Sequence, residues 1–203
     1  MRTLLSGMVI TSCAFVFWNC GNKEVTQEQT TTTFTRLDSL TDAYLGLQDS
    51  MLQAWNIMIH DDNQKIKAMH NLIHELMISS PEKSEELAIY EQRLDQLMRL
   101  RYTQKTMANA DVVEEYDFAS NSLISELLAL AESQTEFNYN TTLQKLAEEI
   151  NQADQRVNNY REEYDLIVAS YNRFIEKNQK DIKDIDAHMS MEKRPMFQMV
   201  SEE

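Results

Sequence analysis

Two cysteines, Cys13 and Cys20, have the chemistry that is easiest to assign from position in the chain. Arg2 precedes an apolar run from Leu4 to Trp18, which is shorter than the roughly 20 residues that a membrane-spanning helix needs. A short apolar run behind a basic residue is typical of a signal peptide. A cysteine directly after such a run indicates a bacterial lipoprotein, in which the thiol is acylated by a fatty acid such as palmitate.

The sequence favours Cys20 as the acylated residue and leaves two alternatives open. Phe17-Trp18-Asn19 matches poorly the small residues that usually precede an acylated cysteine, but Cys20 follows a full-length apolar run. Ile10-Thr11-Ser12 fits that pattern before Cys13, but it leaves an apolar run only about half as long as usual. In the third alternative the segment stays uncleaved and anchors the chain. All three place the rest of the chain on the outer side of a membrane.

Two histidines, His70 and His74, lie four residues apart and therefore on one face of a helix, with Glu75 beside them and His60 nearly three turns earlier. This spacing can ligate zinc or copper. Two ligands make an incomplete site, however, and no HExxH pattern is present. We interpret these residues as histidines of a helix surface.

The C-terminal tail combines an imidazole with closely spaced thioethers, a set that suits Cu(I). Its candidate ligands are His188, Met189, Met191, Met196 and Met199. Methionine also fills irregular apolar gaps, and the chain has 12 methionines. We therefore expect the tail to dock on the helical body, with copper binding as the alternative, and we expect neither a resident metal nor a cofactor.

The remaining chemistry argues against an enzyme and against a nucleic-acid-binding protein. The sequence has no Gly-rich phosphate loop, no cysteine after Cys20 and no histidine beside a plausible serine nucleophile. The acidic pairs Glu114-Glu115 and Glu148-Glu149 are typical of solvated helix faces. The formal net charge is −14, whereas binding to phosphates depends on an excess of Lys and Arg. Such a chain is also repelled by anionic lipids, so a membrane must hold it covalently or by insertion.

Composition predicts an all-α fold. The chain has only three glycines and two prolines, and neither type occurs between Glu82 and Arg194. A sheet protein of this size needs several turns built from these residues. We expect an elongated antiparallel bundle of about four helices with heptad packing like that of a coiled coil.

The first two helices have clear boundary signals. Thr35 and Asp38 have the spacing of a capping box, so the first helix should begin there. Its apolar stripe weakens over His60–Lys65, and Pro81 should end it. We expect Ser80 to cap the second helix, which fades near Met107-Ala108-Asn109. A third, less regular helix follows, and a polar stretch separates it from the last helix.

The last helix, which Asn140 or Thr141 should cap, has the most regular pattern. Apolar residues alternate three and four positions apart over ten consecutive matches, as in a left-handed seam between helices. The predicted seam consists of Leu143, Leu146, Ile150, Ala153, Val157, Tyr160, Tyr164, Ile167, Tyr171 and Phe174.

These patterns divide the chain into four parts. They are a lipoprotein signal peptide over residues 1–19, a lipidated Cys20 with a flexible tether over 20–34, a helical bundle over 35–179, and a helical extension and tail over 180–203.

Several motifs of the helical body resemble the LemA family. They are Gln53-Ala54-Trp55, Met69–Ile73, the run Ala153–Val157 with Arg161, Tyr164-Asp165, Tyr171-Asn172 and Ile175, and finally Pro195-Met196-Phe197. The resemblance spans roughly residues 44 to 197. It implies one helical bundle on the outer face of a membrane, and it implies no reaction. This sequence departs from the family in three places. His70 stands where the family has Pro, and Asp165 stands where the first of the family's two Tyr-Asn pairs has Asn. A lipoprotein signal peptide stands in place of the membrane-spanning N-terminus that is common in the family.

We therefore expect a non-catalytic, membrane-tethered protein of the bacterial cell envelope that contacts other envelope proteins, whose identity the sequence leaves open. The alternative is a copper-binding envelope protein that uses the tail.

Overall fold

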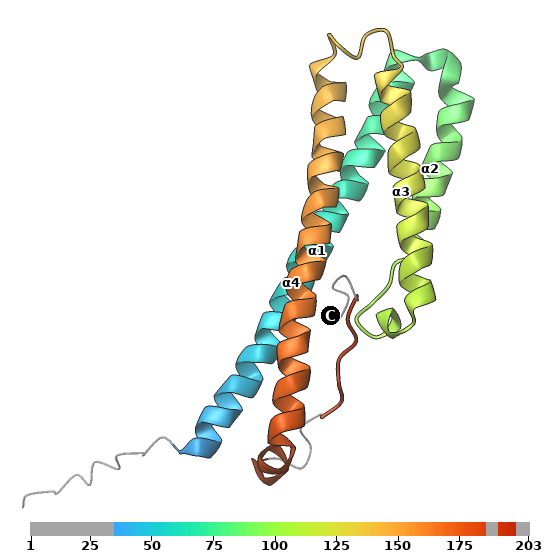
Figure 1. Cartoon of the computed structure of the whole chain (residues 1–203). Helices are drawn as coiled ribbons and strands as arrows, with labels where there is room; N and C mark the ends of the chain where they lie inside the picture. Colours follow the sequence, from blue (N-terminus) through green and yellow to red (C-terminus); the bar gives the residue numbers. More distant parts are fainter. Residues whose placement is uncertain (1–34, 186–190, 198–203) are drawn as a thin grey trace, which may run out of the picture. The chain divides into compact units, whose positions relative to one another are not determined.

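The computed structural model describes residues 35–185 and 191–197. Every regular element among these residues is a helix, which confirms the all-α prediction. The four α-helices run alternately up and down (Figure 1). Their bounds are α1 Arg36–Ser79, α2 Ser84–Arg99, α3 Ala110–Glu132 and α4 Thr141–Ile185. Two 3₁₀ turns, Pro81–Lys83 and Thr106–Ala108, lie in the connections around α2.

The start of α1 has the predicted capping box. The Asp38 amide donates to the Thr35 hydroxyl at 3.2 Å, and the Thr35 amide donates to the Asp38 carboxylate at 2.8 Å. The helix then runs for 44 residues without a break. Because His70 has a backbone N–H where the family has Pro, nothing at that position forces a kink.

Two predictions for the region around α2 are wrong. Ser80 stands at the N-cap position of the 3₁₀ turn Pro81–Lys83, not of α2, and its side chain makes no capping hydrogen bond. Its hydroxyl instead donates to Gln134, in the connection before α4, at 2.8 Å. In addition, α2 ends at Arg99 and not near Met107. Ending there lets the chain turn inward, so that Tyr102 and Met107 are buried side chains of the connection.

The last helix begins where the sequence predicts. The Asn140 carboxamide oxygen accepts hydrogen bonds from the amides of Thr142 and Leu143, at 3.0 and 3.2 Å. The helix continues past residue 179 to Ile185, with one non-helical residue, Asn178, near that expected boundary. Residues 186–190 lie outside the described part of the chain.

The helices define two regions with different packing. The long helices α1 and α4 lie side by side, whereas the shorter α2 and α3 cover only the part of them near the α1–α2 turn (Figure 1). We call this part the four-helix half. We call the remaining pair, α1 from Arg36 to Ile57 and α4 from Asp165 to Ile185, the two-helix stem.

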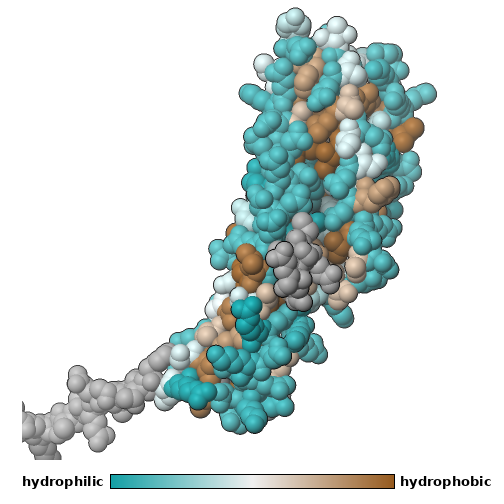
Figure 2. Space-filling view, in the orientation of Figure 1, coloured by the Kyte–Doolittle hydropathy of each residue, from teal (hydrophilic) through white to brown (hydrophobic). Residues whose placement is uncertain are grey.

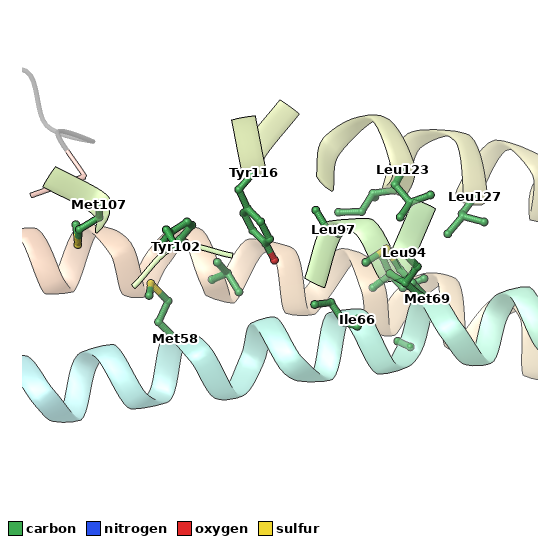
Figure 3. Close-up of a cluster of buried hydrophobic side chains, with 14 of the residues drawn as sticks. Met58, Ile66, Met69, Leu94, Leu97, Tyr102, Met107, Tyr116, Leu123 and Leu127 are labelled. Carbon is green, nitrogen blue, oxygen red and sulfur yellow. The ribbon is translucent and has the colours of Figure 1, made fainter. Parts of the chain in front are cut away.

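The core of the four-helix half is a continuous apolar layer between all four helices. Figure 3 shows side chains of α2 and α3, among them Leu94, Leu97, Leu123 and Leu127, meeting Ile66 and Met69 of α1. No helix of residues 35–185 is long and apolar enough to cross a membrane.

The predicted seam of α4 faces α1, but its members are buried unequally. Six are buried: Leu143, Ile150, Ala153, Val157, Tyr164 and Tyr171. Leu146, Tyr160, Ile167 and Phe174 are half-buried. Their neighbours Ala147, Arg161, Val168 and Ile175 are buried in addition, because α1 and the covering helices contact a face wider than one heptad stripe.

Candidate functional site

Charged residues occupy the inward face of α1 where its apolar stripe weakens. Asp61, Asp62 and Lys65 are 7, 4 and 2% exposed, between the buried Met58 and Met69. They continue the three-four spacing of the stripe with charges in place of apolar side chains. Burying a charge is costly unless it is paired and hydrogen-bonded, so these residues require partners.

Asp62 is the centre of this group. The Tyr116 hydroxyl donates its one hydrogen to this carboxylate, and its oxygen lies 2.7 and 2.8 Å from the two carboxylate oxygens. The Asp62 carboxylate also forms ion pairs with Arg101 at 2.6 Å and with Lys65 at 3.3 Å. Figure 3 shows Tyr116 reaching from α3 toward α1. One carboxylate thus joins α1, α3 and the α2–α3 connection.

Arg161 of α4 is the second centre. Its guanidinium donates to both carboxylate oxygens of Asp117 on α3, at 2.6 and 2.8 Å, and to the Tyr102 hydroxyl at 2.6 and 3.1 Å. This two-pronged geometry is a strong form of ion pair. Nearby, Lys65 pairs with Asp154 of α4 at 3.0 Å. We call the group around Asp62 and Arg161 the polar junction, because it lies where the four-helix half meets the stem.

Burial and the charges of the junction shift the pKa values of its members. Burial raises the pKa of Tyr102 to about 12. Burial, together with the Asp62 carboxylate, raises the pKa of Tyr116 well above its usual range. Although burial opposes it, the pKa of Arg161 is raised because Asp117 accepts hydrogen bonds from the guanidinium. The junction therefore holds neutral tyrosines and a permanently charged arginine, so none of these three groups is poised to exchange protons near neutral pH.

The C-terminal segment, residues 191–197, lies along α4 and is held by its backbone. The Arg194 amide donates to the Asn172 carboxamide oxygen at 2.7 Å, and the Asn172 amide group donates to the Arg194 carbonyl at 2.9 Å. The Phe197 amide donates to the Asp165 carboxylate at 2.7 Å. An aspartate in place of the family's Asn therefore keeps the acceptor that this contact needs.

An aromatic cage holds the Phe197 ring. Its centroid lies 6.2 Å from that of Trp55 in a stacked arrangement, and 5.5 and 5.7 Å from those of Tyr102 and Tyr164 at steep angles. The Arg161 guanidinium carbon lies 5.0 Å from the Phe197 ring centroid, at the distance of a cation–π contact. The tail and the polar junction thus form one connected structure.

The metal candidates of the sequence divide between exposed and packed positions. His60, His70 and His74 are exposed on α1, and among the described residues no three His, Cys, Asp or Glu side chains form a group that could hold a metal ion. Met191 and Met196 are half-buried against the hydrophobic core. His188, Met189, Met199, Cys13 and Cys20 lie outside the described residues.

Sequence reasoning missed most of the polar junction. Arg161, Asp165, Asn172 and Phe197 were identified only as parts of the family resemblance, and Tyr164 was predicted as a seam residue as well. Asp62, Arg101, Tyr102, Tyr116 and Asp117 were not identified as site residues. The available signal was the phase of α1, since Asp61, Asp62 and Lys65 stand where a continuous stripe would be apolar.

Fold and site define a class of helical-bundle protein in which the last helix binds the C-terminal segment through Arg, Asp and Asn side chains. A family model described as the LemA family matches residues 63–203, and the chain belongs to this family. The Gln53-Ala54-Trp55 motif lies before the matched range. Neither a search of curated proteins nor a search of solved structures found a match. The family is associated with bacterial membranes and is not a known enzyme family.

Proposed function

We propose that this chain is a non-catalytic, membrane-tethered protein of the bacterial cell envelope that contacts other envelope proteins through its two-helix stem. The observation that carries the proposal is the uneven cover of α1 and α4. In the four-helix half, α2 and α3 pack against α1 and α4 and cover part of their surface. In the stem no described helix does so, and Leu37, Leu45 and Leu52 of α1 are 44, 47 and 53% exposed.

The partner that fits this surface is an amphipathic helix. The spacing of the leucines, eight and then seven residues, places them on one side of α1 beside the buried seam residues Tyr44 and Met51. Apolar side chains reach the surface along the stem between hydrophilic ones (Figure 2). A helix docked there would repeat the packing that α2 and α3 provide in the other half, which is a common mode of recognition.

The polar residues of the molecule favour binding over catalysis. The buried ionisable groups of the junction contact one another, and the histidines His60, His70 and His74 lie apart from them on the surface of α1. An active site needs a nucleophile or a general base that is directed at a substrate. These residues instead stabilise the fold and hold the tail.

A photo-crosslinking experiment in cells tests the proposal. A photoreactive amino acid at Leu45 should give protein adducts, whereas the same group at the exposed Glu85 of α2 should not. Adding Leu37→Gln should lower the yield at Leu45, since it removes apolar contact area from the same surface. If Leu45 gives no adducts, or no more than Glu85, the stem is not the contact surface.

The tether requires its own test, because residues 1–34 lie outside the described part of the chain. We expect Cys20→Ala to abolish labelling by a fatty-acid analogue and to leave an unprocessed precursor. Cys13→Ala should be labelled and processed normally. Labelling that persists in the Cys20 variant and disappears in the Cys13 variant would show that Cys13 begins the mature chain.

A further inference from the structure

A cleft of about 640 Å³ lies between the stem part of α1, the α2–α3 connection and the C-terminal segment. Its volume falls within the range of about 300–1,000 Å³ that is usual for small-molecule sites. Its lining residues are Gln48, Met51, Leu52, Gln104, Lys105, Ala108, Tyr164, Glu192, Lys193, Arg194 and Pro195.

The cleft gathers positive charge in a strongly acidic chain. Lys105, Lys193 and Arg194 line it against a single carboxylate, Glu192, while the whole chain has a formal net charge of −14. Lys193 pairs with Glu176 at 3.4 Å. No described carboxylate forms an ion pair with Lys105 or Arg194. Within residues 35–185 and 191–197, these two cations of the cleft thus have no carboxylate in an ion pair and can contact an anion.

Tyr164 adds a polar group to the wall of the cleft. The residue is only 2% exposed and belongs to the lining of the cleft. Arg194 lines the same cleft, and its charge opposes the rise that burial causes in the pKa of Tyr164.

The backbone clamp on the tail fixes the position of Arg194. Asn172 both donates to and accepts from the backbone of this residue, so the side chain starts from a defined point beside the cleft. Apolar walls face it, because Met51 is buried on α1, Leu52 follows it, and Pro195 continues the tail. Cations and a hydroxyl thus lie beside an apolar surface.

We propose that this cleft binds a carboxylate carried on a small apolar body, with Arg194, Lys105 and the Tyr164 hydroxyl contacting the carboxylate and Met51, Leu52 and Pro195 contacting the body. Two sources share this chemistry, a free organic acid and the C-terminal carboxylate of a peptide that ends in an apolar residue. Both place charge-assisted hydrogen bonds next to buried apolar area.

Matched ligands test the proposal on the fragment of residues 34–203. This fragment forms one compact unit that contains every residue of the described core. In a titration followed by NMR chemical shifts, octanoate should bind at least about tenfold more tightly than octanamide, a difference of about 1.4 kcal/mol. The two molecules share the same apolar chain, so equal binding of octanoate and octanamide would overturn the proposal. Failure of both octanoate and the peptide acid acetyl-Ala-Leu to bind would also overturn it.

Variants place the binding in this cleft. Arg194→Gln and Lys105→Gln should each weaken octanoate binding several-fold, and Tyr164→Phe should weaken it less. Lys177→Gln removes an exposed cation of α4 that does not line the cleft, and it should leave binding unchanged. The Lys105 side chain is exposed, so its variant keeps the test valid should Arg194→Gln unfold the tail. Equal binding by the Lys105 and Lys177 variants would show that the cleft is not the site.

A second ligand pair separates the two sources. Acetyl-Ala-Leu with a free carboxylate should be compared with its C-terminal amide and with octanoate. Tighter binding of the peptide acid than of its amide and of octanoate would identify a peptide terminus, whereas binding of octanoate alone would identify a free acid. Leu52 belongs to both surfaces, but Leu45 does not line the cleft, so crosslinking at Leu45 tests the stem interface without testing the ligand site.

Discussion

The four-helix half and the two-helix stem are built from the same pair of long helices, but they are stabilised differently. In the four-helix half an apolar layer between four helices buries side chains such as Met69, Leu72 and Leu127 completely. In the stem the pair is covered by one extended segment, whose backbone forms hydrogen bonds with the side chains of Asp165 and Asn172 on α4. Between them lies the polar junction.

The comparison shows how one helix pair carries two tasks. A region with four helices gains stability from apolar burial and leaves little contact area for a partner. A region with two helices is less stable by itself, and it retains apolar surface that a partner or ligand can cover. The junction separates the regions because its charges form their ion pairs only when α1, α3, α4 and the α2–α3 connection meet in one arrangement.

The largest effect should come from removing the centre of the junction. Asp62→Ala leaves Lys65, Arg101 and the Tyr116 hydroxyl without their shared partner, and breaking a buried ion pair in this way costs about 3–5 kcal/mol. Urea unfolding followed by helical circular dichroism measures it. Asp95→Ala, at an exposed position of α2, should change the free energy of unfolding by no more than about 0.5 kcal/mol. A cost below about 1 kcal/mol for Asp62→Ala would mean that the junction does not hold the two regions together.

The same substitution made in each region sharpens the comparison. Ile150 is fully buried in the four-helix half, so Ile150→Ala should cost about 2–5 kcal/mol. Ile167 is half-buried in the stem, where we expect roughly half that loss. Urea midpoints of the two variants measure the difference, with Glu162→Ala as the exposed control. Equal losses would remove the distinction between the regions, and parent-like midpoints would show that the α4 stripe is no core seam.

Releasing the tail should affect the stem and the polar junction that the tail contacts. Phe197→Ala removes the ring from the cage of Trp55, Tyr102 and Tyr164, and since Phe197 is half-buried we expect a loss of about 1–3 kcal/mol. In the fragment from Thr35 onward Trp55 is the only tryptophan, so its fluorescence reports the cage directly. Glu192→Ala, at an exposed position of the tail, is the control. Unchanged fluorescence in the Phe197 variant would show that the ring does not occupy the cage in solution.

The smallest effect concerns alkaline pH. Burial raises the pKa of Tyr164 from 10.0 to about 12, so its contribution to stability is complete below pH 10 and is lost as the pH rises through about 12. The free energy of unfolding should therefore fall above pH 10, and it should fall less steeply in Tyr164→Phe. Urea unfolding at several pH values between 9 and 12 measures both slopes. Identical slopes in parent and variant would contradict a buried, neutral Tyr164.

The sequence alone was sufficient for the all-α class, the start of α1 and the start of α4. These features are local: the Thr35–Asp38 capping box and the Asn140 cap involve residues three positions apart or fewer, and the scarcity of Gly and Pro acts along the chain. The family was also within reach, because the spacing of Arg161, Tyr164-Asp165 and Tyr171-Asn172 on one helix is itself a sequence pattern.

Only the tertiary structure decided what those residues contact. Asp62 and Tyr116 are 54 positions apart, and Asp165 and Phe197 are 32 apart, so no local pattern indicates either pair. The apolar stripe of α1 is interrupted over His60–Lys65. The inward positions there belong to the core, but charged side chains occupy them, and their partners come from α3, α4 and the α2–α3 connection. Periodicity reports which side of a helix faces inward, but whether an inward charge is tolerated depends on groups brought to it by folding.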